Sequence, residues 1–393
     1  MAKALPKVAL VWAQFAPYHI DRCNAVGERL AGRADVLAVE VATTSQDYAW
    51  NPSGAVDHAT KITLFPGESF DAVRPWRRLK ALWGLLRQCD MVFMGIPYSV
   101  IDVMILSCLL RFTRTRLVML TDSKFDDIAR DSLFELCKAL VLSFYRAAIV
   151  AGHRQKAYLH FLRFRRRPVL LGYDVVSVDR IRAQADAGRQ GPPLPMAERD
   201  FLYVGRFVPK KRLLVLIEAY GAYVARAGSA ARRLVLAGSG PQEPAMRALI
   251  AQLGLTDKVV FTGFLQGAEI AQAMDRALAL LLVSIEEQWG LVVNEALAVG
   301  LPVIAARQVG ATDSLVANLV NGFVVQPEDQ ETLVQAMLRM AGDEAGWQAM
   351  AQASRDLAWR GDCARLADAV EILFAPGAEP ATSRHHAFEA QIS

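Results

Sequence analysis

The chain has 393 residues, of which 53% are hydrophobic and 21% charged, and this composition excludes a mostly disordered chain. A single hydrophobic core rarely grows to this size, so we expect two domains. The net charge is +4, but Lys and Arg outnumber Asp and Glu only in residues 1–200, so the first half is the part that an anionic surface would attract.

Cysteine usage and the N-terminus indicate a cytoplasmic protein. The cysteines are odd in number, scattered, and without CxxC spacing or neighbouring histidines: they are Cys23, Cys89, Cys108, Cys137 and Cys363. We therefore expect reduced core residues, and neither a disulfide framework nor a zinc site. The apolar patch within residues 1–15 is too short and too soon interrupted for a secretory signal.

Short apolar runs alternate with helical patterns through the first half. The helical patterns cover segments such as residues 19–31 and 132–146. The apolar runs, which predict strands, are residues 7–13, 34–43, 91–96, 116–122 and 147–152. Strand and helix alternation of this kind is typical of a parallel sheet that is covered on both faces.

Two segments of this half bear on membrane contact. Residues 74–88 predict an amphipathic helix whose one face can collect Trp76, Leu79, Leu82, Trp83 and Leu86, with basic residues beside it. One interpretation is peripheral contact with an anionic membrane at the inner face of the cell, and the other is ordinary packing of that face on the sheet. Residues 91–110 are almost long enough to span a membrane, but Pro97 and Asp102 within them favour a strand followed by a helix.

The alternation stops at residues 181–200, which are rich in Ala, Gly, Pro and charge and predict a linker. It resumes with strands predicted at residues 201–206, 232–240, 258–265, 277–285, 301–307 and 321–327. We therefore expect doubly wound α/β domains at residues 1–180 and 201–355, a C-terminal helix at 356–375 and a disordered tail at 376–393.

Ligands of open parallel sheets bind beyond the carboxyl ends of the strands, and in the second half these ends are rich in glycine and charge. Gly205 permits close backbone approach, Arg206 offers a forked guanidinium, and Lys210 or Lys211 can add a second positive charge, which together suit a diphosphate. The alternative is a solvated turn before a basic helix start. The next strand ends carry Gly238, Gly263 and Phe264.

The segment EEQWGLVVNEALAVGLPV, residues 286–303, holds two acids in an apolar context. We expect Glu287 in a loop, a turn at Gly290 and a helix from Leu291 to about Val299, with Glu295 one turn inside it. A carboxylate there can accept two hydrogen bonds from a ribose diol, and the backbone N–H groups at Gly290 and Leu291 can bind a phosphate. The alternative is that both acids are structural, although an unpaired carboxylate would be costly at position 295.

These residues resemble the signature region of family 4 retaining glycosyltransferases of the GT-B fold, with the glutamates of the E-x7-E motif at Glu287 and Glu295. The likeness includes YVGRFVPKKRL, LVLAGSGP and VVFTGFL and covers roughly residues 200–345. It implies two Rossmann-like domains that face each other across a cleft, with the C-terminal helix returning to the N-terminal domain, where the acceptor binds. It also implies that Arg206 and Lys211 hold the donor diphosphate, that Glu287 contacts the donor sugar, that Glu295 binds the ribose, and that residues 262–265 frame the base.

The N-terminal half matches this family only loosely. Many members have a glycine-rich loop after the first strand, whereas this chain has WAQFAPYHIDR at residues 12–22. We expect Gln14, Tyr18 and His19 to meet the acceptor or the donor phosphate instead. Asp122 and Lys124 after one strand, and His153 after another, are further acceptor-side candidates, and ordinary surface or capping roles remain open for all three.

The sequence therefore predicts a metal-independent glycosyltransferase that moves a sugar from a nucleotide-diphosphate sugar to a saccharide or lipid-linked acceptor, in bacterial polysaccharide or glycolipid biosynthesis. No acidic pair is placed as a metal-ligand set, and we expect no other cofactor and no nucleic-acid partner. Two alternatives stay open: a non-catalytic nucleotide-sugar-binding module, and a sugar-nucleotide epimerase or phosphorylase of the same fold.

Overall fold

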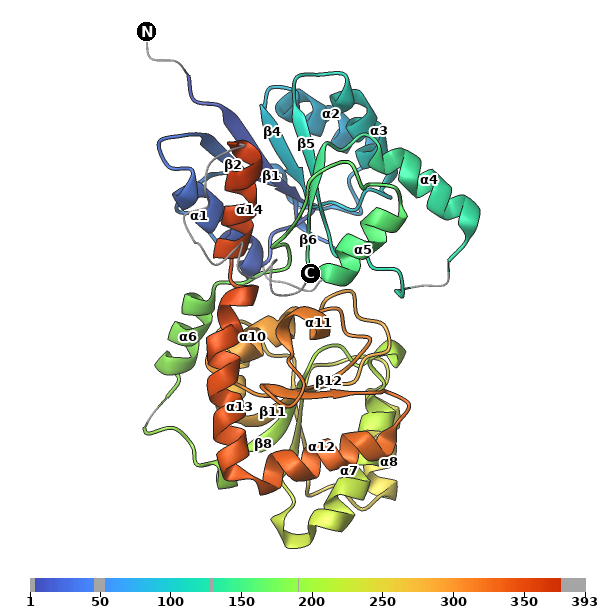
Figure 1. Cartoon of the computed structure of the whole chain (residues 1–393), viewed down its shortest axis with the longest axis vertical. Coiled ribbons are helices and arrows are strands. Elements are labelled where there is room, and N and C mark those ends of the chain that lie inside the picture. Colours follow the sequence, from blue (N-terminus) through green and yellow to red (C-terminus); the bar gives the residue numbers. More distant parts are fainter. Residues whose placement is uncertain (1–3, 46–53, 128–129, 190, 376–393) are drawn as a thin grey trace. The chain divides into compact units, whose positions relative to one another are not determined.

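The computed structural model describes residues 4–45, 54–127, 130–189 and 191–375, which divide into two compact units (Figure 1). Unit 1 comprises Met1–Phe125, Ala129–Ser177 and Cys363–Ser393, and unit 2 comprises Asp126–Ile128 and Val178–Asp362. Unit 2 thus begins before the expected linker, because residues 181–187 belong to helix α6 (Val178–Ala187). The tail expected at 376–393 lies outside the described residues.

Unit 1 contains a parallel sheet with the strand order β3-β2-β1-β4-β5-β6-β7, seven strands among the described residues. The apolar runs of the first half form its buried strands, as predicted. Two further strands, β3 and β7, lie at the sheet edges. The strands are β1 (Lys7–Trp12), β2 (Asp35–Thr44), β3 (Thr60–Ser69), β4 (Met91–Met94), β5 (Arg116–Thr121), β6 (Ala147–Val150) and β7 (Val169–Leu171).

Helices cover this sheet, and one of them comes from the far end of the chain. The helices of unit 1 are α1 (Pro17–Arg29), α2 (Pro75–Leu86), α3 (Ile101–Arg111), α4 (Ser132–Leu142), α5 (His153–Phe161) and α14 (Ala364–Phe374). Helix α14 lies beside α1 (Figure 1), where Arg29 forms ion pairs with Asp368 and Glu371 and Arg33 pairs with Glu371. The expected return of the C-terminal helix to the N-terminal domain is therefore confirmed.

The two segments that raised the question of membrane contact are resolved within unit 1. Leu82 and Leu86 of α2 are fully buried and Leu79 and Trp83 are partly buried, whereas Trp76 is 60% exposed, so most of the predicted apolar face packs inside the unit. Residues 91–110 form β4 and α3, and Asp102 of α3 makes a bidentate ion pair with Arg78 of α2 at 2.7 and 2.8 Å. Across the described parts of the chain, none of the helices is long and apolar enough to cross a membrane.

Unit 2 repeats the architecture with the strand order β10-β9-β8-β11-β12-β13. Its strands are β8 (Asp200–Val204), β9 (Leu234–Ala237), β10 (Val259–Gly263), β11 (Ala277–Leu282), β12 (Val303–Ala306) and β13 (Gly322–Val325). Besides α6, its helices are α7 (Leu213–Ala227), α8 (Glu243–Gln252), α9 (Ala268–Asp275), α10 (Leu291–Val299), α11 (Thr312–Leu315), α12 (Gln330–Gly342) and α13 (Glu344–Leu357).

Both sheets have the doubly wound topology, in which the strand order reverses direction once. The reversal lies between β1 and β4 in unit 1 and between β8 and β11 in unit 2. A crevice at the carboxyl ends of the strands forms at such a point, because the connections on its two sides leave toward opposite faces of the sheet. The predicted fold class is confirmed. Binding sites are therefore expected at the carboxyl ends of the strands beside these two reversals.

The C-terminal helical pattern is divided between the units. Helix α13 ends at Leu357 and is followed by the 3-10 turn η4 (Ala358–Gly361), and α14 begins only at Ala364. The expected helix at 356–375 therefore spans the end of one helix, a turn and a second helix.

Candidate functional site

The candidate site of unit 2 begins where its strand order reverses. Strand β8 leads into Gly205 and Arg206, and the neighbouring β11 leads into Ser284 and Glu287. A backbone hydrogen bond of 3.0 Å from Ile285 N to the carbonyl of Lys210 joins the two loops. The sheet therefore brings together two segments that carry the predicted basic and acidic residues.

Lys211 and Glu287 meet directly at this edge. Lys211 ends the 3-10 turn η2 (Pro209–Lys211), and its ammonium group forms an ion pair with the Glu287 carboxylate. The two side chains are only 11% and 18% exposed, and the Ser284 hydroxyl donates a 3.3 Å hydrogen bond to the same carboxylate oxygen. Glu287 thus holds the lysine ammonium at a fixed place at the site, whereas the sequence assigned the two residues separate roles.

Arg206 lies on the same edge, with an exposed side chain. Its carbonyl accepts a 3.1 Å hydrogen bond from the hydroxyl of Tyr203. Burial raises the pKa of Tyr203, the negative charge of Glu287 raises it further and the positive charge of Arg206 opposes the rise. Both charges therefore act on one tyrosine. The guanidinium of Arg206, for which no ion pair is found within the described residues, is open to an anion.

Three strand ends carry glycines that lie against each other. Gly205 N donates to the carbonyl of Ala237 at 2.9 Å, and Gly238 N donates to the carbonyl of Gly263 at 2.8 Å. Gly238 has a φ of +146°, and a Cβ there would lie 1.9 Å from the carbonyl oxygen of Gly205. Only glycine allows this approach. Phe264, which follows Gly263, is half exposed and offers an aromatic face beside these loops.

The loop of Glu287 and the helix of Glu295 follow the predicted plan. Gly290 has a φ of +98° and precedes α10, which begins at Leu291 and ends at Val299 as expected. The first backbone N–H groups of this nine-residue helix have no partner within it. Glu295 lies in its second turn and is partly buried.

Hydrogen bonds that the sequence did not predict hold this loop in place. Gly310 N donates to the carbonyl of Glu287 at 3.1 Å, and Ala311 N donates to the carbonyl of Trp289 at 2.9 Å. The indole of Trp289 donates to Asn294, which in turn donates to the carbonyl of Gly361, at 2.9 and 3.1 Å. These bonds join residues that are not periodic in the sequence, so no sequence pattern indicates them.

Gln14, Tyr18 and His19 lie where the strand order of unit 1 reverses. Gln14 and His19 are buried, and Tyr18 is half-buried beside the guanidinium of Arg22. The Nδ1 atom of His19 accepts a 2.9 Å hydrogen bond from the backbone N–H of Ala16. Burial, and secondarily the charge of Arg22, hold the pKa of His19 well below its usual range. The imidazole is therefore neutral at pH 7, and its proton is on Nε2.

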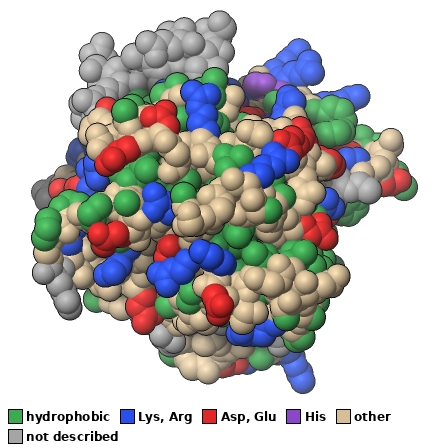
Figure 2. Space-filling model, turned by 90° about the horizontal axis from the view of Figure 1, so that it is seen from below, with side chains coloured by type: hydrophobic (Ala, Val, Ile, Leu, Met, Phe, Trp, Pro, Cys, Tyr) green, Lys and Arg blue, Asp and Glu red, His purple; other side chains and the backbone are tan. Residues whose placement is uncertain are grey.

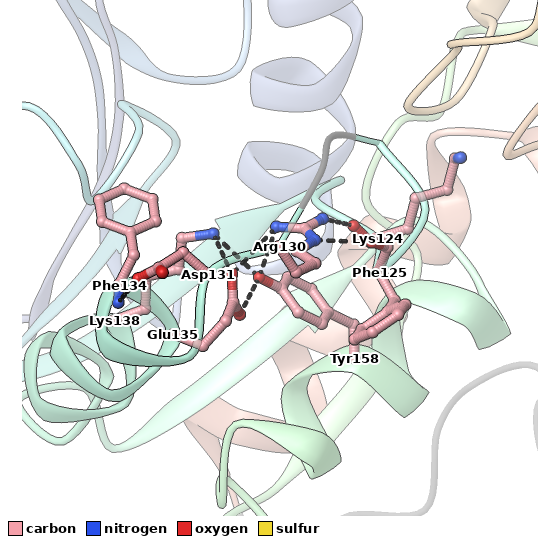
Figure 3. A network of polar contacts seen from close by, with 8 residues as sticks. All are labelled: Lys124, Phe125, Arg130, Asp131, Phe134, Glu135, Lys138 and Tyr158. Atoms are coloured by element: carbon pink, nitrogen blue, oxygen red, sulfur yellow. Dashed lines mark hydrogen bonds and ion pairs between the residues drawn. The ribbon is translucent and has the colours of Figure 1, made fainter.

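The remaining acceptor-side candidates follow β5 and β6 of unit 1. Asp122 is half-buried after β5, His153 is the first residue of α5, and Lys124 is fully buried. The Lys124 carbonyl accepts from the guanidinium of Arg130, whereas its ammonium group points away from the cluster around Tyr158 (Figure 3). The candidates of unit 1 thus share one edge of their own sheet, and those of unit 2 share another.

The described residues provide no cluster typical of a metal site. Within these residues, no group of three or more His, Cys, Asp or Glu side chains is arranged to hold a metal ion. The five cysteines are free, but only Cys23 and Cys89 are buried; Cys108 and Cys363 are partly buried and Cys137 is exposed, so the expectation of core residues is wrong for Cys137. Burial raises the pKa of the Cys89 thiol to about 11, so this thiol is protonated at neutral pH.

Part of the chain is similar in sequence to known glycosyltransferases. Residues 185–357, which lie within unit 2, match the family model of glycosyl transferases group 1. The uncharacterized glycosyltransferase MJ1607 of Methanocaldococcus jannaschii is 32% identical over 37% of this chain and 36% of its own length. The 2-deoxystreptamine glucosyltransferase of Streptomyces kanamyceticus is also 32% identical, over 47% of this chain and 45% of its own length. The alignments thus span less than half the length of these curated relatives.

The likeness in structure extends over both units. The structure of Anabaena HepE in complex with UDP and glucose has a TM-score of 0.70 and 17% sequence identity, and the match covers 94% of this chain and 99% of that chain. Identity at this level supports the fold alone. The predicted fold of two doubly wound α/β domains is thereby confirmed, and the match of residues 185–357 supports the resemblance to glycosyltransferases over that part of the chain.

Proposed function

We propose that this chain transfers a sugar from a nucleotide-diphosphate sugar to a saccharide or lipid-linked acceptor. The transfer would retain the anomeric configuration. The match to the group 1 glycosyltransferase family model and the GT-B fold support this proposal. The observation that carries the proposal is the meeting of Lys211 and Glu287 beside Arg206 at the strand reversal of unit 2. A fixed cation and an exposed cation suit a diphosphate, and an acid beside them suits sugar hydroxyls.

Each donor contact has a proposed residue. Arg206 and Lys211 hold the diphosphate, and the backbone at Gly205 and Gly238 permits its close approach. Glu287 contacts the donor sugar. Glu295 binds the ribose, and the N-terminal N–H groups of α10 at Gly290 and Leu291 add positive potential for the phosphates.

The base and the acceptor complete the proposal. Gly263 and Phe264 frame the base, and UDP is the first nucleotide to test because the HepE structure contains it. Gln14, Tyr18, His19, Asp122, Lys124 and His153 are proposed for the acceptor side. We further propose that the transfer needs no metal ion, because two cations and a helix N-terminus provide the charge that the leaving diphosphate requires.

The pathway and the location of the protein belong to the same proposal. A saccharide or lipid-linked acceptor is consistent with bacterial polysaccharide or glycolipid biosynthesis. The reaction would take place in the cytoplasm, at the inner face of the cell membrane when the acceptor is carried on a lipid.

A thermal-shift screen tests the donor assignment. UDP-, GDP-, ADP- and dTDP-sugars are added in turn, and the matching donor raises the melting temperature because it binds only the native state. Glu295→Ala should abolish the shift, whereas Glu218→Ala, which removes an exposed carboxylate from α7 of the same unit, should leave it intact. A full shift in Glu295→Ala would overturn the ribose assignment, and binding without product across a broad acceptor panel would favour a non-catalytic module.

A further inference from the structure

Helix α4 has its two charged side chains inside and four of its large apolar side chains outside. Glu135 is buried and Lys138 is partly buried, one helical turn apart. The opposite side chains are exposed: Leu133 70%, Phe134 52%, Leu136 60% and Leu140 66%. A helix on a water-exposed surface has the reverse arrangement, so the outer face of α4 lacks the partner that its composition requires.

A polar network fixes this orientation of α4 (Figure 3). The Glu135 carboxylate accepts hydrogen bonds from the Tyr158 hydroxyl at 2.6 Å, from Lys138 at 2.9 Å and from Arg130 at 3.3 Å. Burial opposes ionisation of Glu135, but the hydrogen bonds from Tyr158 and Lys138 and the two positive charges outweigh it, and the pKa of Glu135 is lowered. Rotation of α4 to bury its leucines would break these bonds and leave buried polar groups unsatisfied.

Helix α3 also carries exposed apolar residues. It packs beside α4 (Figure 1), and its exposed apolar residues recur at helical spacing as one stripe: Ile101, Ile105, Leu109 and, just beyond its end, Phe112, which is 84% exposed. We call these four residues, together with Leu133, Phe134, Leu136 and Leu140 of α4, the α3–α4 surface. The face of the molecule in Figure 2 shows the ordinary composition instead, with acidic and basic side chains interspersed among apolar ones.

Arginines lie at one end of the α3–α4 surface. Arg167 donates a 3.0 Å hydrogen bond to the carbonyl of Leu142, the last residue of α4. Arg111 is the last residue of α3. Burial lowers the pKa of Arg167, and the positive charges of Arg111 and Arg146 lower it further. Within the described chain, none of the three forms an ion pair with a carboxylate. The residues just before Arg167 include further exposed arginines at positions 163, 165 and 166.

We propose that the α3–α4 surface docks unit 1 on an anionic lipid bilayer, with the leucines and phenylalanines in the acyl boundary and the arginines at the phosphate groups. An apolar face beside a basic rim is the combination that interfacial helices use. At eleven residues, α4 is far too short to span the bilayer and would lie in its plane. The docking does not depend on the proposed activity, although it would hold the enzyme at a lipid-linked acceptor.

The charge of the rim distinguishes a bilayer from a second copy of the chain. Uncompensated arginines need anionic groups around them when their apolar neighbours lose water. A bilayer rich in phosphatidylglycerol provides such groups over the whole surface. The same surface of another copy offers more arginines and leucines, so self-association would leave the rim unpaired.

Vesicle co-sedimentation of the full chain tests the proposal. Vesicles of phosphatidylcholine with phosphatidylglycerol should bind the chain, and vesicles of phosphatidylcholine alone should bind it far less. Leu136→Ser with Leu140→Ser should reduce binding at least tenfold. Arg111→Gln with Arg146→Gln should reduce it about fivefold for each arginine removed, and added salt should weaken the wild type in the same direction.

A matched control keeps the outcome clear. Leu253→Ser removes a leucine that is 41% exposed on unit 2 and should bind vesicles as the wild type does. All variants should keep the wild-type melting temperature, because the substituted side chains are exposed. Equal binding by Leu136→Ser with Leu140→Ser, or no binding of the wild type to anionic vesicles at low salt, would overturn the proposal. A dimer that the same substitutions dissociate, without vesicle binding, would assign the surface to self-association instead.

Discussion

The ammonium group of Lys211 and the carboxylate of Glu287 form an ion pair between residues that lie 76 positions apart in the sequence. One comes from the loop after β8 and the other from the loop after β11, two strands that are neighbours in the sheet although three strands apart in the chain. Since both side chains are mostly buried, each fixes the position of the other. A cation for the diphosphate and an acid for the sugar are thus arranged before a donor binds.

Glu287→Gln should separate sugar transfer from nucleotide binding. The amide keeps the shape of the side chain and removes its charge, so the diphosphate still meets Lys211 and Arg206 while the sugar loses its carboxylate. We expect the turnover to fall about a hundredfold, which is typical of the loss of one preorganised polar contact, and the affinity for UDP to change by less than about threefold. Steady-state rates and calorimetry measure the two effects.

The neighbouring Glu286 provides the control for this substitution. Glu286 is exposed in the same loop, so Glu286→Gln should leave both the turnover and the affinity near the wild-type values. Equal turnover in Glu287→Gln and Glu286→Gln would remove Glu287 from the reaction.

Gly238→Ala should destabilise unit 2 and weaken donor binding together. The added Cβ would lie 1.9 Å from the carbonyl oxygen of Gly205, so the loops after β8 and β9 must move apart, at a cost of about 3 kcal/mol. Gly342→Ala is the control, because a Cβ at the end of α12 meets no atom within 4 Å. Chemical denaturation measures the loss of stability, and an unchanged midpoint for Gly238→Ala would contradict the described approach of the two glycines.

Glu371→Gln should loosen the attachment of α14 in a manner that depends on pH. Burial opposes ionisation of Glu371, but hydrogen bonds and charges from Arg33 and Arg29 lower its pKa below the ordinary value of 4.5. Because the folded pKa is the lower one, the stabilisation is present above about pH 4.5 and is lost as the pH falls toward the folded value. At pH 7 we expect a loss of about 2 kcal/mol on substitution.

The difference in free energy of unfolding between the wild type and Glu371→Gln should therefore shrink below pH 4.5. Urea unfolding between pH 3.5 and 7, values chosen to bracket the titration, measures this difference. Glu28→Gln, at an exposed position of α1, is the control and should show no such dependence. A constant difference across the range would show that the ion pairs do not contribute to the stability of unit 1.

The fold could be predicted from the sequence where a strand is a continuous apolar run. Residues 7–13 and 277–285 are of this kind, and they form β1 and β11 at the two strand reversals. Strand β3 was not predicted because it is an edge strand, with partly exposed polar residues and with Pro66 and Gly67 inside it. Strand β7 has only three residues, too few for any periodic signal.

The start of α10 was predicted because local rules decide it: a glycine with positive φ precedes a run of good helix formers. The contact between Lys211 and Glu287 could not be predicted, because it depends on which strands are neighbours. The orientation of α4 was not predicted either. Its apolar residues favour an inward face, and only the tertiary network around Tyr158 reverses it.

The central claim is that the strand reversal of unit 2 binds the diphosphate of a nucleotide sugar. Calorimetric titration of UDP into the wild type and into the double variant Arg206→Ala with Lys211→Ala tests this claim most directly. Each charge-assisted hydrogen bond contributes about 1.5–3 kcal/mol, so we expect the double variant to bind UDP at least a hundredfold more weakly, measured at a temperature at which circular dichroism shows both proteins to be folded. Equal affinity in the two proteins would contradict the account.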